Sequence, residues 1–318
     1  MTYVAGLDIG ATHVRGAIAD GSGAIVAQVS LDTPQTDVGI EVTERVLATL
    51  RAVAGEAGLD PTDVAAVGIG SIGPLDLTDG VLENPANLPS GIERIPLVGP
   101  VRNAIGSDRV YLRNDATTGV VGERFYGDRT PDNMVYLTIS SGIGAGVIVD
   151  GTLVRGWDGN AAEVGHMVVD PEGRRTCGCG RPGHWEAYAS GDNIPAYTRD
   201  LADRLDVSTD LPLTDPDFSA ADVYDATDDP LATRVRERVT RWNVIGVANV
   251  VHAYAPFVVA IGGSVALNNP ATVVEPLVER VPDRLMINVP EIRQTSFGDD
   301  VVLRGAVALA LTNAGIAE

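Results

Sequence analysis

The sequence predicts an α/β protein built from two domains of related topology. Residues 2–126 alternate short β-rich segments with helical patterns. The chain has 318 residues, enough for two such domains with hydrophobic cores. A segment near the middle of the chain also repeats the pattern of the N-terminal strands.

The N-terminal part predicts strands followed by a helix. Residues 2–10, 13–21 and 23–30 are β-rich and punctuated by glycine, which favours short strands joined by tight turns. Residues 37–59 then show a helical spacing that ends near Gly58, with apolar residues at Val38, Val42, Val46, Leu50 and Val53. Further strands are expected at 63–71 and 109–116, and a helix from about Ala116 to Tyr126.

The internal repeat links residues 7–21, LDIGATHVRGAIADG, to residues 137–151, LTISSGIGAGVIVDG. A shift of 130 positions aligns them without a gap, with identities at Leu7/Leu137, Ile9/Ile139, Gly16/Gly146, Ile18/Ile148, Asp20/Asp150 and Gly21/Gly151. Two similar hairpins could match this well by chance, but the matches include the turn ends. We therefore expect each domain to open with a β-hairpin whose turn lies at one mouth of a shared cleft.

The expected domains are residues 1–115 with 303–318, and a larger domain, residues 116–302. The terminal helix, within 300–315, is expected to pack back on the first domain. Residues 200–230 are acidic and rich in turn formers, and are interpreted as helix ends and solvated loops.

Composition excludes several classes of function. The net charge of −20 disfavours nucleic acid as a partner, because an anionic surface repels phosphates. All 23 basic residues are arginine, so a Walker-type phosphate loop, which needs lysine, is absent. This acidic, lysine-free composition favours adaptation to high salt, with base-composition bias as the alternative. No apolar run approaches the ~20 residues of a membrane span, and the N-terminus lacks the features of a signal peptide, which favours the cytoplasm.

Three glycine-rich turns are candidates for phosphate binding. Glycine lets backbone N–H groups approach a phosphate, and hydroxyls add donors. The turns contain Asp8, Gly10 and Thr12, then Ser140, Ser141, Gly142 and Gly144, and finally Gly262, Gly263 and Ser264. Asp8 is a candidate to hold magnesium through water. Such glycines also occur in ordinary turns, so nucleotide binding remains one of two interpretations.

Asn114 and Asp115 stand where an apolar strand gives way to a helix. Asp115 is either a helix cap or a general base at the carboxyl end of a strand, where α/β sheets usually bind ligands.

Four residues in the segment 165–191 are candidate metal ligands. Cys177 and Cys179 are the only cysteines, and His166 and His184 flank them. A disulfide between cysteines one residue apart would be strained, and two unrelated buried cysteines would not explain the histidines. The pattern predicts a structural zinc ion held by these four side chains. Because Glu163 and Glu186 border the loop, the metal is expected to shape a ligand site.

Together these segments resemble the ROK family of sugar kinases and sugar-responsive repressors. The similarity runs along essentially the whole chain through LDIGATHVRGAIAD, GIGSIGPLDLTDGVLENPANLP, RNDATTGVVGE, TISSGIGAGVIVDG, AEVGHM, CGCGRPGHWEAYASG and IGGSVA. The resemblance implies a two-domain actin-like (ribonuclease-H-like) sugar kinase fold with an interdomain cleft. It implies ATP-dependent phosphorylation of a hexose at its 6-hydroxyl, with glucose as the leading candidate. It also implies a homodimer.

The resemblance also implies residue roles. Asp115 would be the catalytic base. Sugar hydroxyls would be bound by Asn87, Asn114, Asp115, Glu163, His166 and Glu186. ATP and magnesium would be bound by Asp8, Gly10, Thr12, Ser141, Gly142, Gly144, Gly262 and Gly263. His166 would use one ring nitrogen for zinc and present the other to the sugar.

The chain departs from the family pattern at three places. His184 replaces a third cysteine, Ser140-Ser141-Gly142 replaces Gly-Thr-Gly, and Ile72-Gly73-Pro74 replaces a Pro-Gly. The acceptor remains open among glucose, fructose, N-acetylmannosamine and N-acetylglucosamine, and the donor among ATP, ADP and polyphosphate. A sugar-sensing regulator is the remaining alternative; the chain begins at its first strand, without the helix-turn-helix domain such regulators carry.

Overall fold

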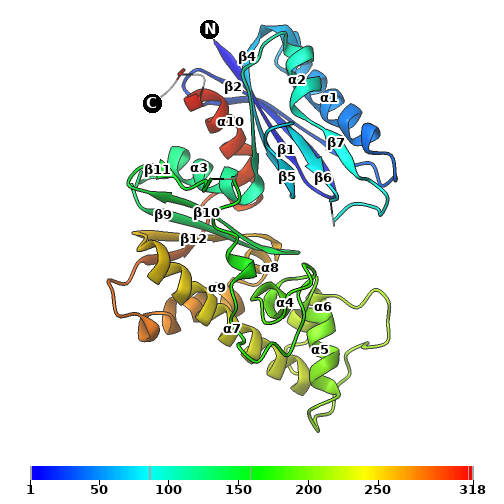
Figure 1. Ribbon diagram of the computed structural model, residues 1–318, viewed down its shortest axis with the longest axis vertical. Coiled ribbons are helices and arrows are strands. Elements are labelled where there is room, and N and C mark those ends of the chain that lie inside the picture. Colours follow the sequence, from blue (N-terminus) through cyan, green and yellow to red (C-terminus); the bar gives the residue numbers. More distant parts are fainter. Residues whose placement is uncertain (1, 86, 158, 314, 317–318) are drawn as a thin grey trace. The chain divides into compact units, whose positions relative to one another are not determined.

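The computed structural model describes residues 2–85, 87–157, 159–313 and 315–316. The chain divides into two compact units, Met1–Thr130 with Asp300–Glu318 (unit 1) and Pro131–Asp299 (unit 2), each with its own five-stranded mixed sheet (Figure 1). The expected boundary lay at residue 115. Helix α3 (Asp115–Tyr126) falls instead in unit 1, because it packs against α10 (Val301–Asn313).

The sheet of unit 1 has the strand order β3-β2-β1-β4-β8. Its strands are β1 (Tyr3–Ile9), β2 (His13–Asp20), β3 (Ile25–Asp32), β4 (Val64–Ser71) and β8 (Val110–Asn114). β1, β2 and β3 form an antiparallel meander, whereas β4 is parallel to both β1 and β8. The expected strands are therefore present, and three of them end at the same edge of the sheet.

The two faces of this sheet are covered by different helices. Ala5 and Leu7 of β1 pack with α1 (Gly39–Glu56) and α2 (Val98–Ile105). Val4 packs with α10 on the opposite face, as the two-residue repeat of a strand requires. Val38, which was expected within the helical stripe, lies just before α1 and is exposed.

The terminal helix α10 approaches the sheet of unit 1 closely, which confirms that it packs on the N-terminal elements. A Cβ added to Gly68 of β4 would lie 1.9 Å from the carbonyl oxygen of Ala306. Only glycine leaves room for this contact. A short 3₁₀ turn, η1 (Pro61–Asp63), precedes β4, and a second, η4 (Gly298–Asp300), precedes α10. A small sheet of β5 (Leu75–Asp76), β6 (Val81–Glu83) and β7 (Arg94–Pro96) completes unit 1.

The sheet of unit 2 repeats the topology of unit 1. Its strand order is β11-β10-β9-β12-β13, with β9 (Met134–Ile139), β10 (Ile143–Val149), β11 (Thr152–Leu153), β12 (Val258–Gly262) and β13 (Glu291–Gln294). β9 and β10 form an antiparallel hairpin, and β12 lies parallel to β9 and β13.

The gapless repeat holds for the first strand of each hairpin but not for the second. Leu7 pairs with Gly16, whereas Leu137 pairs with Ala145 rather than Gly146. The turn of the second hairpin is one residue shorter, and loop length sets hairpin register. Gly16 and Ala145 are therefore the structural equivalents.

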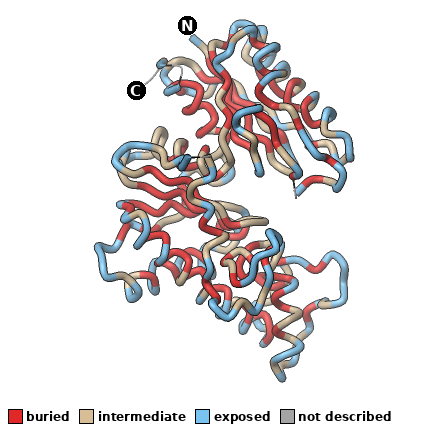
Figure 2. Tube along the Cα trace, viewed as in Figure 1, coloured by how far each residue is buried: buried red, intermediate tan, exposed pale blue. Residues whose placement is uncertain are grey.

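Helices pack against the sheet of unit 2 and form one core with it. They are α4 (Glu186–Ala189), α5 (Ile194–Ala202), α6 (Ala220–Asp225), α7 (Pro230–Tyr254), α8 (Ser264–Asn268) and α9 (Pro270–Arg280), with 3₁₀ turns η2 (Val164–His166) and η3 (Pro282–Arg284). Figure 2 shows buried residues running along the strands of each unit. Trp185 is fully buried, and its indole Nε1 donates to Oδ1 of Asn243 on α7 at 2.8 Å.

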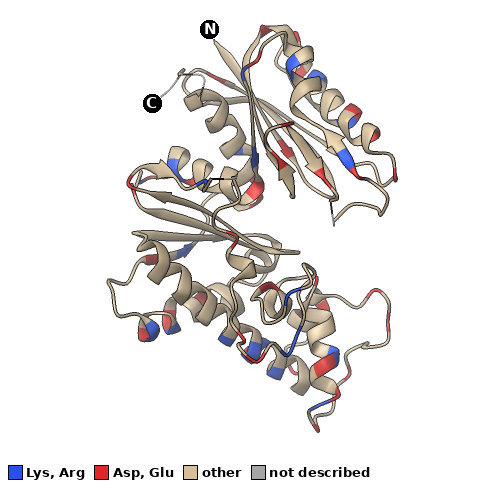
Figure 3. Ribbon diagram, in the orientation of Figure 1, with Lys and Arg blue, Asp and Glu red and all other residues tan. Residues whose placement is uncertain are grey.

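Charged residues are spread over the helices and loops of both units (Figure 3). Residues 200–230 contain the end of α5 and exposed loops, as expected, but also the whole of α6, whose buried residues join the core and which was not predicted. Among the residues that the structure describes, no helix has both the length and the apolar character needed to cross a bilayer.

Candidate functional site

In unit 1 the candidate residues gather at the carboxyl edge of the sheet. Ile9, Ser71 and Asn114 stand opposite one another at the ends of three parallel strands. This register brings Asp8 on β1 and Asp115, which follows β8, to the same edge. Gly10 and Thr12 form the adjoining turn, in which Gly10 N–H donates to the carbonyl of His13 at 2.9 Å.

Asp8 is buried and paired with an arginine. Its Oδ2 accepts a hydrogen bond from Nε of Arg15 at 3.0 Å, across the β1–β2 hairpin. Nη1 of Arg15 also lies 3.5 Å from Oδ1 of Asp300, just before α10. One guanidinium therefore bridges two carboxylates beside the first glycine turn, and the fully charged Arg15 neutralises part of the charge of Asp8.

Asn114 and Asp115 lie at the N-terminus of α3 and make different contacts there. Asn114 is the N-cap of α3, and its Oδ1 accepts from the backbone N–H of Thr117 at 2.8 Å. Asp115 is the first residue of the helix and is partly exposed, and one of its oxygens accepts from the backbone N–H of Ala116 at 2.7 Å. The cap of α3 is thus supplied by Asn114. Asn87 is exposed and lies in the segment between β6 and β7.

In unit 2 two of the glycine turns lie side by side. Gly262, the last residue of β12, stands opposite Thr138 near the end of β9, and the hydroxyls of Ser140 and Ser264 are 3.0 Å apart. Gly263 has a φ of +87°, and a Cβ there would lie 2.6 Å from the carbonyl oxygen of Ile139. Ser141, Gly142 and Gly144 complete this donor-rich surface.

The four predicted metal ligands lie together. His166, Cys177, Cys179 and His184 each offer an atom within 4.8 Å of all the others. Sγ of Cys177 is 3.7 Å from Nδ1 of His166, and Sγ of Cys179 is 3.2 Å from Nδ1 of His184. A tetrahedral zinc ion with bonds of about 2.3 Å to sulfur and about 2.0 Å to nitrogen needs S–N separations of about 3.5 Å. Both cysteines are free thiols, and these two S–N separations are close to the one that zinc requires.

Burial makes the thiol of Cys177 a weak acid unless a cation is present. Desolvation raises its pKa to about 11, with a smaller contribution from the nearby carboxylate of Glu186. Desolvation lowers the pKa of His184, and the neighbouring His166 acts in the same direction, so the neutral imidazole that a metal requires is favoured.

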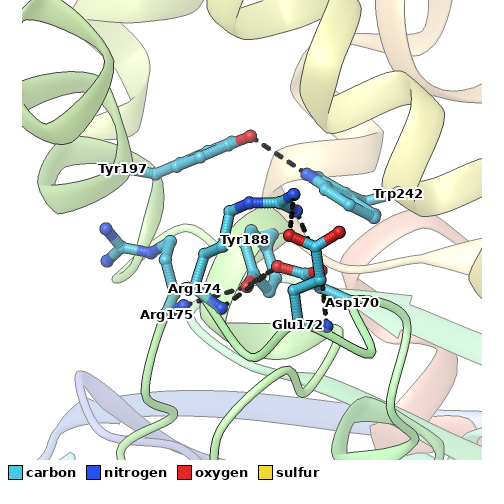
Figure 4. A network of polar contacts seen from close by, with 7 residues as sticks. All are labelled: Asp170, Glu172, Arg174, Arg175, Tyr188, Tyr197 and Trp242. Carbon is cyan, nitrogen blue, oxygen red and sulfur yellow. Dashed lines mark hydrogen bonds and ion pairs between the residues drawn. The ribbon is translucent and has the colours of Figure 1, made fainter. Parts of the chain in front are cut away.

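A polar network holds residues 170–175 on the helices of unit 2 (Figure 4). These residues lie near the start of the segment 166–184 that carries the four predicted metal ligands, here called the metal loop. The buried carboxylate of Asp170 accepts from the hydroxyl of Tyr188 at 2.7 Å and from the backbone N–H of Arg174 at 3.2 Å. The same tyrosine hydroxyl accepts from the backbone N–H of Arg175 at 3.0 Å. Tyr188 belongs to α4, so these bonds fix residues 170–175 to the helix that begins with Glu186. Beside them, Nε1 of Trp242 donates to the hydroxyl of Tyr197 at 3.1 Å.

Glu163, His166 and Glu186 surround the metal loop, as expected. Nε2 of His166, the nitrogen turned away from Cys177, is 4.0 Å from a carboxylate oxygen of Glu163. Although the side chain of Glu163 is 49 % exposed, desolvation raises its pKa; Glu186 adds to this effect and His166 opposes it. Oε1 of Glu186 is 3.8 Å from Sγ of Cys177, and its Oε2 accepts from the backbone N–H of Ile143 at 3.0 Å. The arrangement offers acceptors and an imidazole suited to a polyhydroxylated ligand.

Sequence reasoning did not single out Arg15, Asp300, Asp170 or the Ile143 N–H. Arg15 had an accessible signal, because a four-residue connection between Ile9 and Val14 places Asp8 opposite Arg15. The contact between Glu186 and Ile143 spans 43 residues and has no local signature.

Comparison with known proteins gives concordant results. The family model described as ROK family matches residues 4–313. A glucokinase from Pyrobaculum calidifontis is 37% identical over 98% of this chain and 95% of its own length.

Solved structures show the same fold. The ROK hexokinase from Thermus thermophilus superposes with a TM-score of 0.82 at 30% identity, covering 99% of this chain and 100% of that one. A ROK family glucokinase from Streptomyces griseus, solved with glucose and AMPPNP, gives a TM-score of 0.75 at 28% identity over 98% and 99% of the two chains.

Proposed function

The chain belongs to the ROK family, and from this premise we propose that it is a glucokinase that transfers the γ-phosphoryl group of ATP to the 6-hydroxyl of glucose. Similarity to a glucokinase over nearly the full length supports the reaction. The single structural observation that carries the proposal is the placement of Asp115 after β8, at the same carboxyl edge of the sheet of unit 1 as the glycine turn that follows Asp8 on β1, with β4 between the two strands.

Asp115 is the group that accepts the proton of the attacking hydroxyl. Asn114 supplies the helix cap, and Asp115 places a carboxylate at the first position of α3, at the edge of the sheet. Proton removal raises the nucleophilicity of the sugar oxygen as it approaches the γ-phosphorus, in line with the leaving β–γ bridging oxygen. The phosphoryl group passes to the sugar, ADP leaves, and Asp115 releases the proton to solvent.

Phosphoryl transfer of this kind depends mainly on alignment and charge neutralisation. The hydroxyl of Thr12 and the backbone N–H groups of Ser141, Gly142 and Gly263 belong to turns that suit phosphates, with Gly10, Gly144 and Gly262 shaping their surroundings. Magnesium, when bound near Asp8, would offset the charge of the phosphates. Arg15, already held by Asp8 and Asp300, is a cation close to the same turn in a chain without lysine.

Sugar recognition is assigned to Asn87, Asn114, Asp115, Glu163, His166 and Glu186. Carboxylates accept hydrogen bonds from hydroxyls, whereas amides and imidazole both donate and accept them, so this set matches a ligand with several hydroxyls. Zinc held by His166, Cys177, Cys179 and His184 would fix the ring of His166 through Nδ1 and leave Nε2 for the sugar.

A coupled assay over acceptors and donors tests the proposal. Glucose, fructose, N-acetylmannosamine and N-acetylglucosamine are each combined with ATP, ADP and polyphosphate in the presence of magnesium. The proposal expects the highest kcat/KM for glucose with ATP. A preference for another sugar would assign the chain to a different ROK kinase, and the absence of transfer to every acceptor would favour a sugar-sensing regulator.

The same proposal includes zinc, a homodimer, a cytoplasmic location and adaptation to high salt. The donor geometry supports zinc, and the net charge of −20 with no lysine supports salt adaptation. The homodimer rests on family resemblance. Metal analysis of the purified protein tests for zinc, and light scattering tests for the homodimer.

A further inference from the structure

The segment from Glu186 to Asp192 holds the turn between β9 and β10 by three hydrogen bonds. Gly191 N–H donates to the carbonyl of Ser140 at 2.7 Å, and Asp192 N–H donates to the carbonyl of Ser141 at 3.2 Å. The third bond is different in kind, because the carboxylate of Glu186 accepts from the backbone N–H of Ile143 at 3.0 Å. This turn contains Ser141 and Gly142, which the proposed function assigns to the nucleotide.

The bond from Ile143 has energetic weight. Ile143 is the first residue of β10 and is only 5% exposed, so water cannot easily replace a lost partner. A buried N–H without an acceptor is costly. The carboxylate also lies close to Gly142, since a Cβ there would be 2.9 Å from Oε2 of Glu186.

The other oxygen of the same carboxylate contacts the metal loop. Oε1 of Glu186 lies 3.8 Å from Sγ of Cys177. One side chain therefore connects the proposed zinc centre to the end of the proposed nucleotide turn, and both contacts lie within unit 2.

We propose that Glu186 is a positioning residue for the phosphate donor, in addition to its place beside the sugar. Its carboxylate fixes the β9–β10 turn in the conformation that receives the nucleotide phosphates. This inference rests on the proposed function, because it presumes that the turn binds a nucleotide. The proposed positioning role requires an acceptor oxygen as far from the backbone as that of a glutamate side chain. It does not require the negative charge.

Nucleotide binding without sugar tests the positioning role, since no turnover then occurs. The probe is a non-hydrolysable ATP analogue with magnesium, titrated calorimetrically into the full chain. Glu186→Ala and Glu186→Asp remove the acceptor or shorten its reach, and are expected to raise the Kd of the analogue about tenfold or more, the scale set by an unpaired buried donor. Glu186→Gln keeps an oxygen at the same reach and is expected to stay within about threefold of the unmodified chain.

Glu163→Ala is the matched control. Glu163 is the other carboxylate beside the metal loop, and its recorded partner is His166. The control is expected to leave the Kd of the analogue within about twofold while weakening glucose binding. A glutamate that serves the sugar alone would behave in the same way, so an unchanged Kd in both Glu186→Ala and Glu186→Asp overturns the inference. Weakening in Glu186→Gln but not in Glu186→Asp also overturns it, because charge rather than reach would then matter.

Amide hydrogen exchange gives a second measurement that does not depend on ligands. The Ile143 N–H is expected to exchange at least about tenfold faster in Glu186→Asp than in Glu186→Gln or Glu163→Ala. Equal exchange in all three variants contradicts the positioning role. If the unmodified chain binds the analogue but phosphorylates no hexose, only the proposed function fails; if it binds no nucleotide, both fail.

Discussion

Sγ of Cys179 lies 3.2 Å from Nδ1 of His184, which places the histidine where it completes a set of four metal ligands. The longer side chain of histidine is accommodated by the turn that Cys177 begins, in which Gly180 N–H donates to the carbonyl of Cys177 at 2.8 Å. Gly180 has a φ of +82°, a conformation that favours glycine. The four side chains would offer two thiolates and two imidazoles to the proposed zinc ion.

Replacement of His184 tests this donor set. His184→Ala is expected to lower zinc affinity by at least about tenfold, because three protein ligands remain, whereas His184→Cys should retain stoichiometric zinc. Competition with a chromophoric chelator measures both. Equal zinc affinity in His184→Ala and the unmodified chain would remove His184 from the ligand set.

The ion pair between Arg15 and Asp8 is expected to contribute to the stability of unit 1. Asp8 is 7% exposed, so Arg15→Gln leaves a carboxylate in a poorly solvated position. Because Arg15 is itself 23% exposed, we expect a loss of about 1–3 kcal/mol, less than for a fully buried pair.

The double variant Arg15→Gln with Asp8→Asn provides the control for this prediction. It should recover part of the lost free energy of unfolding, because the unpaired charge is gone. Urea unfolding measures each variant. Strictly additive losses would show that the two side chains do not interact.

Asp170 is expected to make the stability of unit 2 sensitive to acid. Burial alone would raise its pKa, but hydrogen bonds from the Tyr188 hydroxyl and the backbone of residues 172 and 174, with the charge of Arg174, lower it below the ordinary 3.8. On acidification the unfolded chain takes up the proton first. The contribution of Asp170 is therefore complete above about pH 4 and is lost as the pH falls from there through the lower pKa of the folded state.

Asp170→Asn is the variant that isolates this effect. It should destabilise the protein near pH 7, where an amide meets donors that suited a carboxylate, and its difference from the unmodified chain should shrink as the pH falls below 4. Thermal unfolding between pH 2 and pH 7 measures it. A difference that is independent of pH would contradict the assigned ionisation.

The excess of acidic residues predicts that salt stabilises the fold. With a net charge of −20, self-repulsion opposes the compact state, and screening shortens the Debye length from about 10 Å at 0.1 M to about 3 Å at 1 M salt. The free energy of unfolding is expected to rise with KCl over this range, more than with sucrose of matched water activity. A free energy that does not depend on KCl would favour base-composition bias as the origin of the composition.

The sequence predicted two α/β domains of related topology and a cluster of four metal-binding residue types, but not all of the contacts around them. Scarce cysteines and histidines at metal-ligand spacing predicted that His166, Cys177, Cys179 and His184 lie together, as they do in the structure. The hairpin repeat revealed two related sheets, yet a turn shortened by one residue displaced the register of β10. The contact of Glu186 with Ile143 and the packing of α3 on α10 depend on tertiary geometry, which local periodicity does not encode.

The most direct test of the account is phosphoryl transfer to glucose by the Asp115→Asn variant. This variant keeps the size of the side chain and the capping role of Asn114 but removes the proton acceptor. Transfer from labelled ATP is expected to fall at least about a hundredfold, the usual contribution of a general base, while glucose binding stays within a few-fold of the unmodified chain. Transfer at a rate close to that of the unmodified chain would contradict the assignment of Asp115 as the base, and with it the proposed mechanism.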